Sequence, residues 1–284
     1  MSKTKIVSNN TVPSSLTQVG VTIKYTFLNY FRSRRFFILL SITLLISALL
    51  TLVVGYYRPE VFMASDLSFY SSWWGTSVTF VIVLSGVFFG GDAISGEFQN
   101  KTGYFMLPNP IRRSSVYVGK WLSAFIASTI ILSVFTAITV GNGMYYFGLN
   151  VPYQFVESMF FAWFYLAAVL GFTFFFSSVF KSSSMSILVT TILFLFVFTL
   201  IQNLVAGLVQ IEPWFILTYG AQIIGNVLVV PYPPPSSVLN LGPGAGDTLI
   251  TYNVAIPEGL AIIGLYFIIT AFLGLILFER KDFT

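Results

Sequence analysis

The stretch FFILLSITLLISALLTLVVGYY, from Phe36 to Tyr57, decides the fold class of this chain. It is 22 residues long and carries no charge. A helix of about 20 apolar residues is long enough to cross the hydrocarbon of a bilayer. Arg34 and Arg35 precede the stretch and Arg58 follows it, so charged side chains mark both of its ends. The stretch therefore predicts a membrane-spanning helix.

Five further apolar stretches follow along the chain, and charged residues lie close to their ends. They cover about residues 73–91, 121–147, 158–180, 185–209 and 259–278. With 36–57 they make six spans within a transmembrane domain over residues 36–278. We therefore predict an all-α polytopic membrane protein.

The composition of the whole chain supports this class. Of its 284 residues, 56% are hydrophobic and 8% are charged, whereas a soluble domain carries about 25% charged residues. An ordinary soluble domain, a disordered chain and a nucleic-acid binder are excluded. The chain also has no Cys and no His, which excludes disulfides, zinc–thiolate sites and Ser-His-Asp hydrolysis. We expect no catalytic residue, metal site or cofactor in this chain.

One stretch, residues 214–230, is ambiguous. It is barely long enough to cross, it contains Gln222 and Asn226, and a proline-rich run begins directly after it at Pro231. We predict a re-entrant or interfacial helix here, inside an extracellular loop over residues 210–257. A seventh span is the less favoured alternative.

The distribution of basic residues supports six spans and sets their direction. Lys and Arg accumulate in cytoplasmic loops of membrane proteins. With six spans and a cytoplasmic N-terminus, 13 of the 14 basic residues lie inside and only Arg58 lies outside. A seventh span would move Arg280 and Lys281 outside. We therefore predict a multi-pass protein of the cell membrane with both termini, 1–35 and 279–284, in the cytoplasm.

The segment before the first span has its own pattern. Between residues 16 and 33, apolar side chains such as Leu16, Ile23 and Phe27 recur at helical spacing, and Lys24 lies off that face. This pattern favours an amphipathic helix that lies in the plane of the inner membrane interface. A plain anchoring segment is the alternative.

The loop over residues 92–120 is the most informative part of the chain. The surrounding stretch reads GGDAISGEFQNKTGYFMLPNPIRRSSVYVGKW, from Gly90 to Trp121, and it holds six of the 24 charged residues. Apolar side chains interrupt the polar ones, and Pro108 and Pro110 stop any helix. A short amphipathic helix that projects into the cytosol fits this pattern and could dock in a groove of a soluble partner. A solvated loop without a partner is the alternative.

The order of residues in this loop resembles the loop after span two in permeases of type-2 ABC exporters. In that family an acidic residue, a Gly/Thr turn, a Pro, an Arg and a Gly-Lys pair recur in this order, beside six spans, an in-plane N-terminal helix and re-entrant helices between spans five and six. One departure is that the turn reads Thr-Gly here instead of Gly-Thr. The corresponding residues are Glu97, Lys101-Thr102-Gly103, Pro108-Asn109-Pro110-Ile111-Arg112-Arg113 and Gly119-Lys120.

The resemblance implies a division of labour. The chain would be the permease subunit that exports an amphipathic or hydrophobic substrate, and a separate ATPase subunit would bind ATP and Mg. Two permeases, identical or homologous, and two ATPases would make the transporter. The chain itself has no GxxxxGK[ST] phosphate loop, so we expect no ATP hydrolysis by it alone. The loop after span two would be a coupling helix, and the candidate contacts with the ATPase are Glu97, Lys101, Arg112 and Arg113.

Polar residues within the spans suggest a path. The resemblance assigns the dimer contact and the path to spans one, two and five, and there Ser47, Thr51, Gln202 and Asn203 could face the substrate. Ordinary hydrogen bonding between helices is the favoured alternative for these four residues.

Two rival functions stay open from the sequence. A channel or ion-coupled carrier is disfavoured, because none of the predicted spans contains the charged residue that such carriers commonly keep. A non-transporting regulatory membrane subunit would share the coupling loop, and the sequence does not separate it from a permease.

Overall fold

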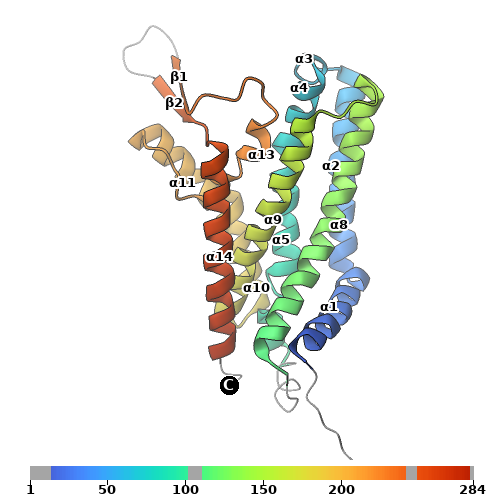
Figure 1. The fold of residues 1–284 in the computed structure, drawn as a ribbon, viewed down its shortest axis with the longest axis vertical. Helices are drawn as coiled ribbons and strands as arrows, with labels where there is room; N and C mark the ends of the chain where they lie inside the picture. Colours follow the sequence, from blue (N-terminus) through green and yellow to red (C-terminus); the bar gives the residue numbers. More distant parts are fainter. Residues whose placement is uncertain (1–13, 102–110, 241–247, 282–284) are drawn as a thin grey trace, which may run out of the picture.

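In the described part of the computed structural model, six helical stretches are long and apolar enough to cross a membrane, which confirms the all-α polytopic fold (Figure 1). The structure describes residues 14–101, 111–240 and 248–281. In chain order the six are α2 (Arg34–Tyr57), the run Asp66–Gln99, α8 (Arg113–Phe147), α9 (Tyr153–Val179), the run Ser183–Val209 and α14 (Ile256–Arg280).

Two of these six stretches change their helical geometry along their length. The second consists of α4 (Asp66–Tyr70), the π-helix η1 (Ser71–Gly75), α5 (Thr76–Gly90) and, after one turn, α6 (Ser95–Gln99). The fifth consists of α10 (Ser183–Ile192), η2 (Leu193–Val197), α11 (Phe198–Leu204) and η3 (Val205–Val209), of which η2 and η3 are π-helical. The π-helix is rare in proteins, and where it occurs it frequently lies at a functional site.

The second and third stretches begin earlier than the sequence predicts. The second starts at Asp66 instead of 73, because Ser65 caps it in a reciprocal capping box with Ser68. The third starts at Arg113 instead of 121. A charge at Lys120 suggests a span boundary there, but the structure pairs this charge with Glu97, and the helix continues through it.

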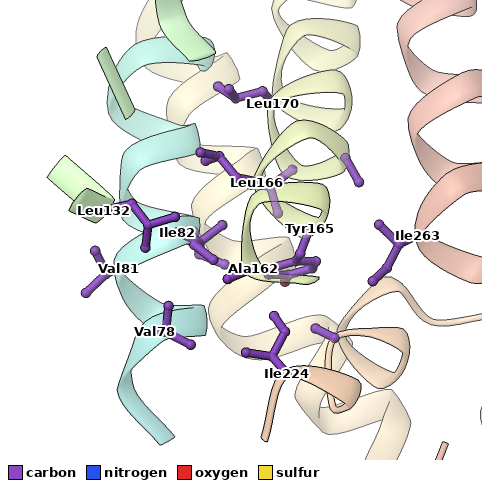
Figure 2. Packing of buried hydrophobic residues seen from close by; sticks show 14 of the residues in the cluster. Val78, Val81, Ile82, Leu132, Ala162, Tyr165, Leu166, Leu170, Ile224 and Ile263 are labelled. Carbon is purple, nitrogen blue, oxygen red and sulfur yellow. The ribbon is translucent and has the colours of Figure 1, made fainter. Parts of the chain in front are cut away.

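The centre of the bundle lies between α5, α8 and α9. Val78 and Ile82 of α5, Leu132 of α8 and Leu166 of α9 pack together there (Figure 2). Within an apolar 18-residue part of each stretch, 67% of the residues are buried in the second stretch, but only 22% in α2, 17% in the Ser183–Val209 run and 22% in α14. The first, fifth and sixth spans therefore leave most of their surface to lipid or to another chain.

Helix α1 (Ser15–Arg32) lies beside α8 at one end of the bundle (Figure 1). The Ser14 side chain caps its start by accepting a hydrogen bond from the backbone N–H of Thr17 at 3.2 Å. Leu16 on its surface is 85% exposed. The helix itself is present over nearly the predicted residues, and its position in the plane of a membrane stays a prediction.

The segment over residues 214–230 forms two helical turns, α12 (Leu217–Gly220) and α13 (Ile223–Asn226), and no span-length helix. Both turns are largely buried, and α12 lies against α14 where Gly220 and Gly259 face each other. Even a Cβ atom on Gly259 would overlap Ile223 and would lie 2.9 Å from the carbonyl oxygen of Gly220. This close contact makes the segment part of the bundle wall.

A β-hairpin follows this segment, and the sequence analysis did not predict it. Strands β1 (Ser236–Asn240) and β2 (Thr248–Tyr252) are antiparallel, with Ser236 opposite Tyr252 and Asn240 opposite Thr248. The proline-rich run at 231–235 leads into β1. The glycine-rich connection over residues 241–247 lies outside the described residues. The hairpin leaves the fold class unchanged, because its two strands contain only ten residues.

The described basic residues gather at one end of the bundle, which we call the basic end. This end carries α1, the start of α2, α6, the start of α8 and the end of α14 (Figure 1). Arg58 lies at the opposite end, near α3 (Glu60–Met63), and the hairpin lies at that end too. Which end faces the cytoplasm stays a prediction. The basic end holds Lys24, Arg32, Arg34, Arg35, Lys101, Arg112, Arg113, Lys120, Lys181, Arg280 and Lys281.

Candidate functional site at the basic end

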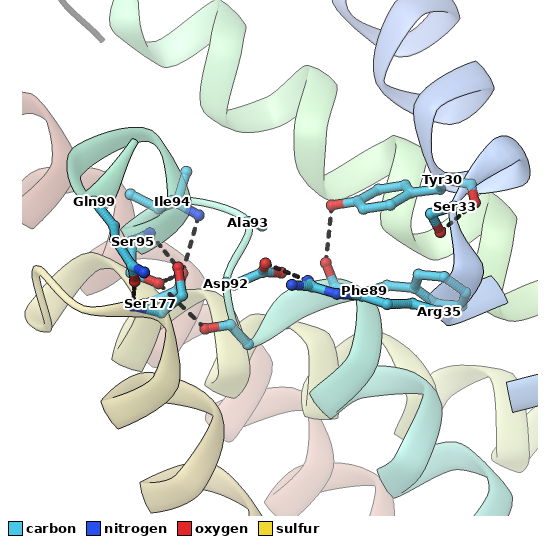
Figure 3. A network of polar contacts seen from close by, with 12 residues as sticks. Tyr30, Ser33, Arg35, Phe89, Asp92, Ala93, Ile94, Ser95, Gln99 and Ser177 are labelled. Atoms are coloured by element: carbon cyan, nitrogen blue, oxygen red, sulfur yellow. Dashed lines mark hydrogen bonds and ion pairs between the residues drawn. The ribbon is translucent and has the colours of Figure 1, made fainter. Parts of the chain in front are cut away.

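Helix α6 is held between two neighbouring spans. The backbone N–H groups of Ile94 and Ser95 both donate to the side-chain oxygen of Ser177 on α9, each at 2.9 Å (Figure 3). At its other end, the side-chain oxygen of Gln99 accepts a hydrogen bond from the backbone N–H of Ser183 at 2.7 Å, where α10 begins. A displacement of α6 would therefore move the ends of spans four and five.

An ion pair joins α6 to α8. Lys120 donates to the carboxylate of Glu97 and, at 2.8 Å, to the backbone carbonyl of Ala93. The two charged side chains are only 10% and 18% exposed. A pair with so little water around it is held rigidly, because either charge would lose much of its solvation if its partner left.

A second ion pair joins the first span to the turn before α6. Arg35 of α2 binds the carboxylate of Asp92, and Tyr30 of α1 donates to the carbonyl oxygen of Phe89 at 2.8 Å (Figure 3). Burial, and then the charge of Asp92, raise the pKa of Tyr30 well above its ordinary value. The hydroxyl consequently stays protonated and keeps its role as a donor.

The end of α14 closes the other side of the site. Lys281 donates to the backbone carbonyls of Ser178 at 2.8 Å and of Phe180 at 2.8 Å, at the end of α9, and it lies 4.4 Å from the centre of the Phe98 ring of α6. Burial, and then the nearby charge of Lys181, lower the pKa of Lys281 to about 8. The carbonyl groups at the C-terminal end of a helix stabilise a nearby positive charge. The contacts of Lys281 therefore connect α6, α9 and α14.

The four loop residues predicted as contacts take two different positions. Glu97 faces inward to Lys120, and Arg113 donates to the backbone carbonyls of Glu279 and Lys281, both at 2.9 Å. Lys101 and Arg112 are exposed. The first two hold the loop to the bundle, and the last two present charge to the outside. Thr102, Gly103, Pro108 and Pro110 of the predicted motif lie outside the described residues.

A cleft of about 580 Å³ lies between α1, α6 and α8. Its wall includes both ion pairs as well as uncharged polar and apolar side chains from α1 and from the start of α8. Such a surface has apolar anchors beside fixed charges, which is the arrangement that protein partners recognise. Its lining residues are Val21, Thr22, Tyr25, Thr26, Asn29, Tyr30, Ser33, Arg35, Asp92, Ala93, Gly96, Glu97, Asn100, Ile111, Val116 and Lys120.

The four residues predicted for a substrate path do not meet within one chain. Ser47 is buried and donates to the carbonyl oxygen of Thr43 at 2.9 Å, and Thr51 donates to that of Ser47 at 2.8 Å, so both bond within α2. Gln202 accepts from Thr218 at 3.2 Å, and Asn203 is exposed. The two groups lie on opposite sides of the bundle (Figure 1).

Several residues of this site were not predicted as site residues from the sequence. Lys120 and Asp92 are charged residues beside apolar spans, and this signal could have identified them as partners for nearby charges. The sequence places Arg35 at the start of the first span, near the lipid phosphates, and does not predict its ion pair with Asp92. No sequence signal marks Ser177, because one serine among many in a helix has no distinguishing pattern.

Comparison with known proteins identifies the family to which the chain belongs. The profile of a family described as ABC-2 family transporter protein matches residues 21–283, which is nearly the whole chain. No curated protein matches the chain. The six spans and the family profile agree with each other, and a family of membrane transport components fits a chain without an ATP-binding loop. The chain therefore belongs to the ABC-2 family of transporter proteins.

Proposed function

We propose that this chain is the permease subunit of an ATP-driven exporter and that a separate ABC ATPase subunit docks on its basic end. The ATPase subunit would hold ATP and Mg, and the chain itself would hydrolyse nothing. Docking would use the cleft between α1, α6 and α8, with the exposed Lys101 and Arg112 as the charged contacts. The basic residues of this end support a cytoplasmic orientation for it.

The observation that carries the proposal is the attachment of α6 to most of the bundle. Polar contacts join α6, or the turn before it, to α2, α8, α9 and α10, and the Phe98 ring contacts Lys281 after α14. A merely solvated loop would not be expected to form contacts with so many helices of the bundle. A partner that pushes or pulls on α6 would move the ends of several spans together, which is what coupling between an ATPase and a permease needs.

The proposal includes a second permease, identical or homologous. Within an 18-residue apolar part of each, only 22% of the residues of α2, 17% of those of the Ser183–Val209 run and 22% of those of α14 are buried in the single chain. Of these three, the resemblance to type-2 exporters favours the first and fifth spans as the dimer contact. If a second copy packs against these faces, Thr51 of one chain and Gln202 and Asn203 of the other come to the same interface, whereas Ser47 stays buried inside its own chain. This arrangement would place a path for an amphipathic or hydrophobic substrate between the two chains.

Site-directed photo-crosslinking tests the docking step. Benzoylphenylalanine is placed at Lys101, at Ile111 or, as a control, at Tyr145, which is 82% exposed at the opposite end of the bundle. The full chain is co-expressed with an ABC ATPase of the same organism. We expect adducts with the ATPase from positions 101 and 111 and none from position 145. Equal adducts from all three positions, or adducts only from 145, would contradict the proposal.

The complex of the chain with the ATPase, reconstituted into lipid vesicles, distinguishes the rival functions. Transport that continues without ATP would indicate a channel or an ion-coupled carrier. An ATPase that docks but drives no transport of any tested amphiphile would indicate a regulatory subunit. ATP-dependent transport supports the permease.

A further inference from the structure

A second cavity, of about 530 Å³, lies away from the basic end, between α5, α9, the fifth span and the α12–α13 segment. Gly75 and Gly225 bring η1 and α13 into backbone contact beside it, since a Cβ on Gly75 would lie 3.2 Å from the Cα of Gly225. Nearby, the indole N–H of Trp74 donates to Ser158 at 2.9 Å, and the Ser158 hydroxyl donates to the carbonyl of Ile224. The wall of the cavity is therefore fixed by specific contacts.

The lining of this cavity is polar but carries no charge among the described residues. Aromatic and aliphatic side chains complete it, and the exposed Phe80 and Thr199 place its mouth between α5 and the fifth span. The polar side chains are those of Thr79, Tyr165, Thr199, Thr218, Gln222, Asn226 and Asn253.

The Tyr165 hydroxyl and the Gln222 side-chain oxygen are among the polar atoms of this lining that are buried without a hydrogen-bond partner. The Tyr165 side chain, on α9 beside Ile224 and Ile263, is completely buried, and no described group bonds to its hydroxyl (Figure 2). The side-chain oxygen of Gln222 likewise has no hydrogen-bond partner within the described ranges. Buried polar groups in proteins are nearly always hydrogen-bonded, and each exception needs an explanation such as a ligand.

The helices around the cavity are irregular where they line it. Gly75 belongs to the π-helix η1, and Phe194 and Leu195 belong to the π-helix η2. Two of the three π-helices in the described ranges therefore contribute to this one cavity. Their wide turns are less stable than α-helix and persist mainly where they serve a site.

We propose that this cavity binds an uncharged amphiphile whose head carries hydroxyl or amide groups. The hydroxyl of Tyr165 and the oxygen of Gln222 offer one donor and two acceptors to such a head, and the side chains of Phe80, Phe194 and Leu195 contact its apolar part. A charged head would lose its hydration and meet no opposite charge on the lining. The assignment of this amphiphile as the exported substrate rests on the proposed function, whereas its binding does not.

Photolabelling of the full chain in lipid nanodiscs tests the site. The probe is a hexyl glucoside with a diazirine in its alkyl chain, and labelled residues are located by mass spectrometry. We expect labels on the α5 and fifth-span walls, near Phe80 and Leu195. Unlabelled hexyl glucoside should compete, whereas hexyl sulfate and hexyltrimethylammonium should not. Labelling elsewhere, or equal competition by all three heads, would overturn the proposal, and so would labelling that no competitor reduces.

The variant Tyr165→Phe gives a sharper test. It removes only the unpartnered hydroxyl, so the Tm of the chain should not fall, while the affinity for hexyl glucoside should fall about two- to tenfold, the effect of one neutral hydrogen bond. Tyr117→Phe is the matched control, because its buried hydroxyl is also without a described partner but lies in α8, away from the cavity. An unchanged affinity in Tyr165→Phe, or an equal loss in Tyr117→Phe, would contradict the proposal.

These measurements use the permease without its ATPase. A failure of binding therefore overturns this site and leaves the docking at the basic end standing. A failure of docking leaves the binding result standing and removes only its meaning for export.

Discussion

At the scale of single residues, the pair of Glu97 and Lys120 shows how charge is accommodated beside the spans. Neither residue could be this deeply buried alone, because an isolated charge out of water costs several kcal/mol. Together, and with the carbonyl of Ala93, they satisfy each other and allow α8 to begin before Lys120. The pair contributes to the geometry of the basic end, and its members are poor choices for a test of docking alone.

We expect Glu97→Gln to destabilise the chain. It leaves the Lys120 charge without its carboxylate, which costs about 3 kcal/mol. The double variant Glu97→Gln with Lys120→Met removes both charges and should recover most of this loss. Thermal unfolding in detergent micelles measures the effect. The control Glu60→Gln changes an exposed acid at the opposite end and should shift stability by less than about 0.5 kcal/mol. A single variant as stable as the wild type would refute the structural role of the pair.

Lys281 predicts a pH dependence of stability. The pKa of Lys281 is lowered from 10.5 to about 8, so between these values the unfolded chain binds more protons than the folded chain. The free energy of unfolding therefore gains a contribution that rises with pH from about 8 to 10.5 and is flat below that window. Unfolding midpoints measured across this range should rise less in Lys281→Met than in the wild type. Identical pH profiles for the two chains would show that Lys281 is not desolvated.

At the scale of elements, the α12–α13 segment shows what the sequence could and could not predict. The short length of residues 214–230 and the polar Gln222 and Asn226 within them correctly argued against a seventh span. Their division into two turns could not be predicted, because it depends on close packing of Gly220 against Gly259, which lie far apart in the sequence. The hairpin was not predicted either, because the proline-rich run directly before β1 is typical of a stiff connector and not of a strand.

The contact between α12 and α14 predicts the effect of a single methyl group. In Gly259→Ala the new Cβ would overlap Ile223, and the forced shift should cost about 1–3 kcal/mol. Gly264→Ala, on the same helix, is the matched control, because its Cβ would meet only the Phe164 ring at 3.5 Å, and alanine favours a helix. Unfolding midpoints of the two variants should therefore move in different directions. Equal midpoints would show that α12 is not seated on α14.

The basic end likewise has some features that the sequence predicts and others that it does not. The clustering of charges marked the loop over residues 92–120 as a site, and the structure does attach its described part to the bundle. The roles of individual residues depend on which way each side chain points. For that reason the sequence could not distinguish the inward Glu97 and Arg113 from the exposed Lys101 and Arg112.

At the scale of the whole molecule, the separation of basic residues predicts the topology. The chain contains no Cys, so single cysteines report cleanly. Cysteines at Ser65 and Ser236, both exposed at the hairpin end, should react with an impermeant reagent in intact cells. One at Ser182, exposed after α9 at the basic end, should react only after the cells are opened. Labelling at Ser182 together with Ser65 in intact cells would contradict the six-span topology.

The central claim is that the exposed charges of the basic end dock an ATPase that drives the permease. Its most direct test is the ATP turnover of the complex in lipid nanodiscs, measured for the double variant Lys101→Glu with Arg112→Glu. Reversal of two interface charges should weaken docking by about 2 kcal/mol or more, which is more than tenfold in affinity. Arg58→Glu, at the opposite end, is the control. We predict that the double variant loses the ATPase and its permease-dependent turnover while its Tm stays within about 2 °C of the wild type, as is typical of surface substitutions. A double variant that keeps both the partner and the turnover of the wild type would contradict the account.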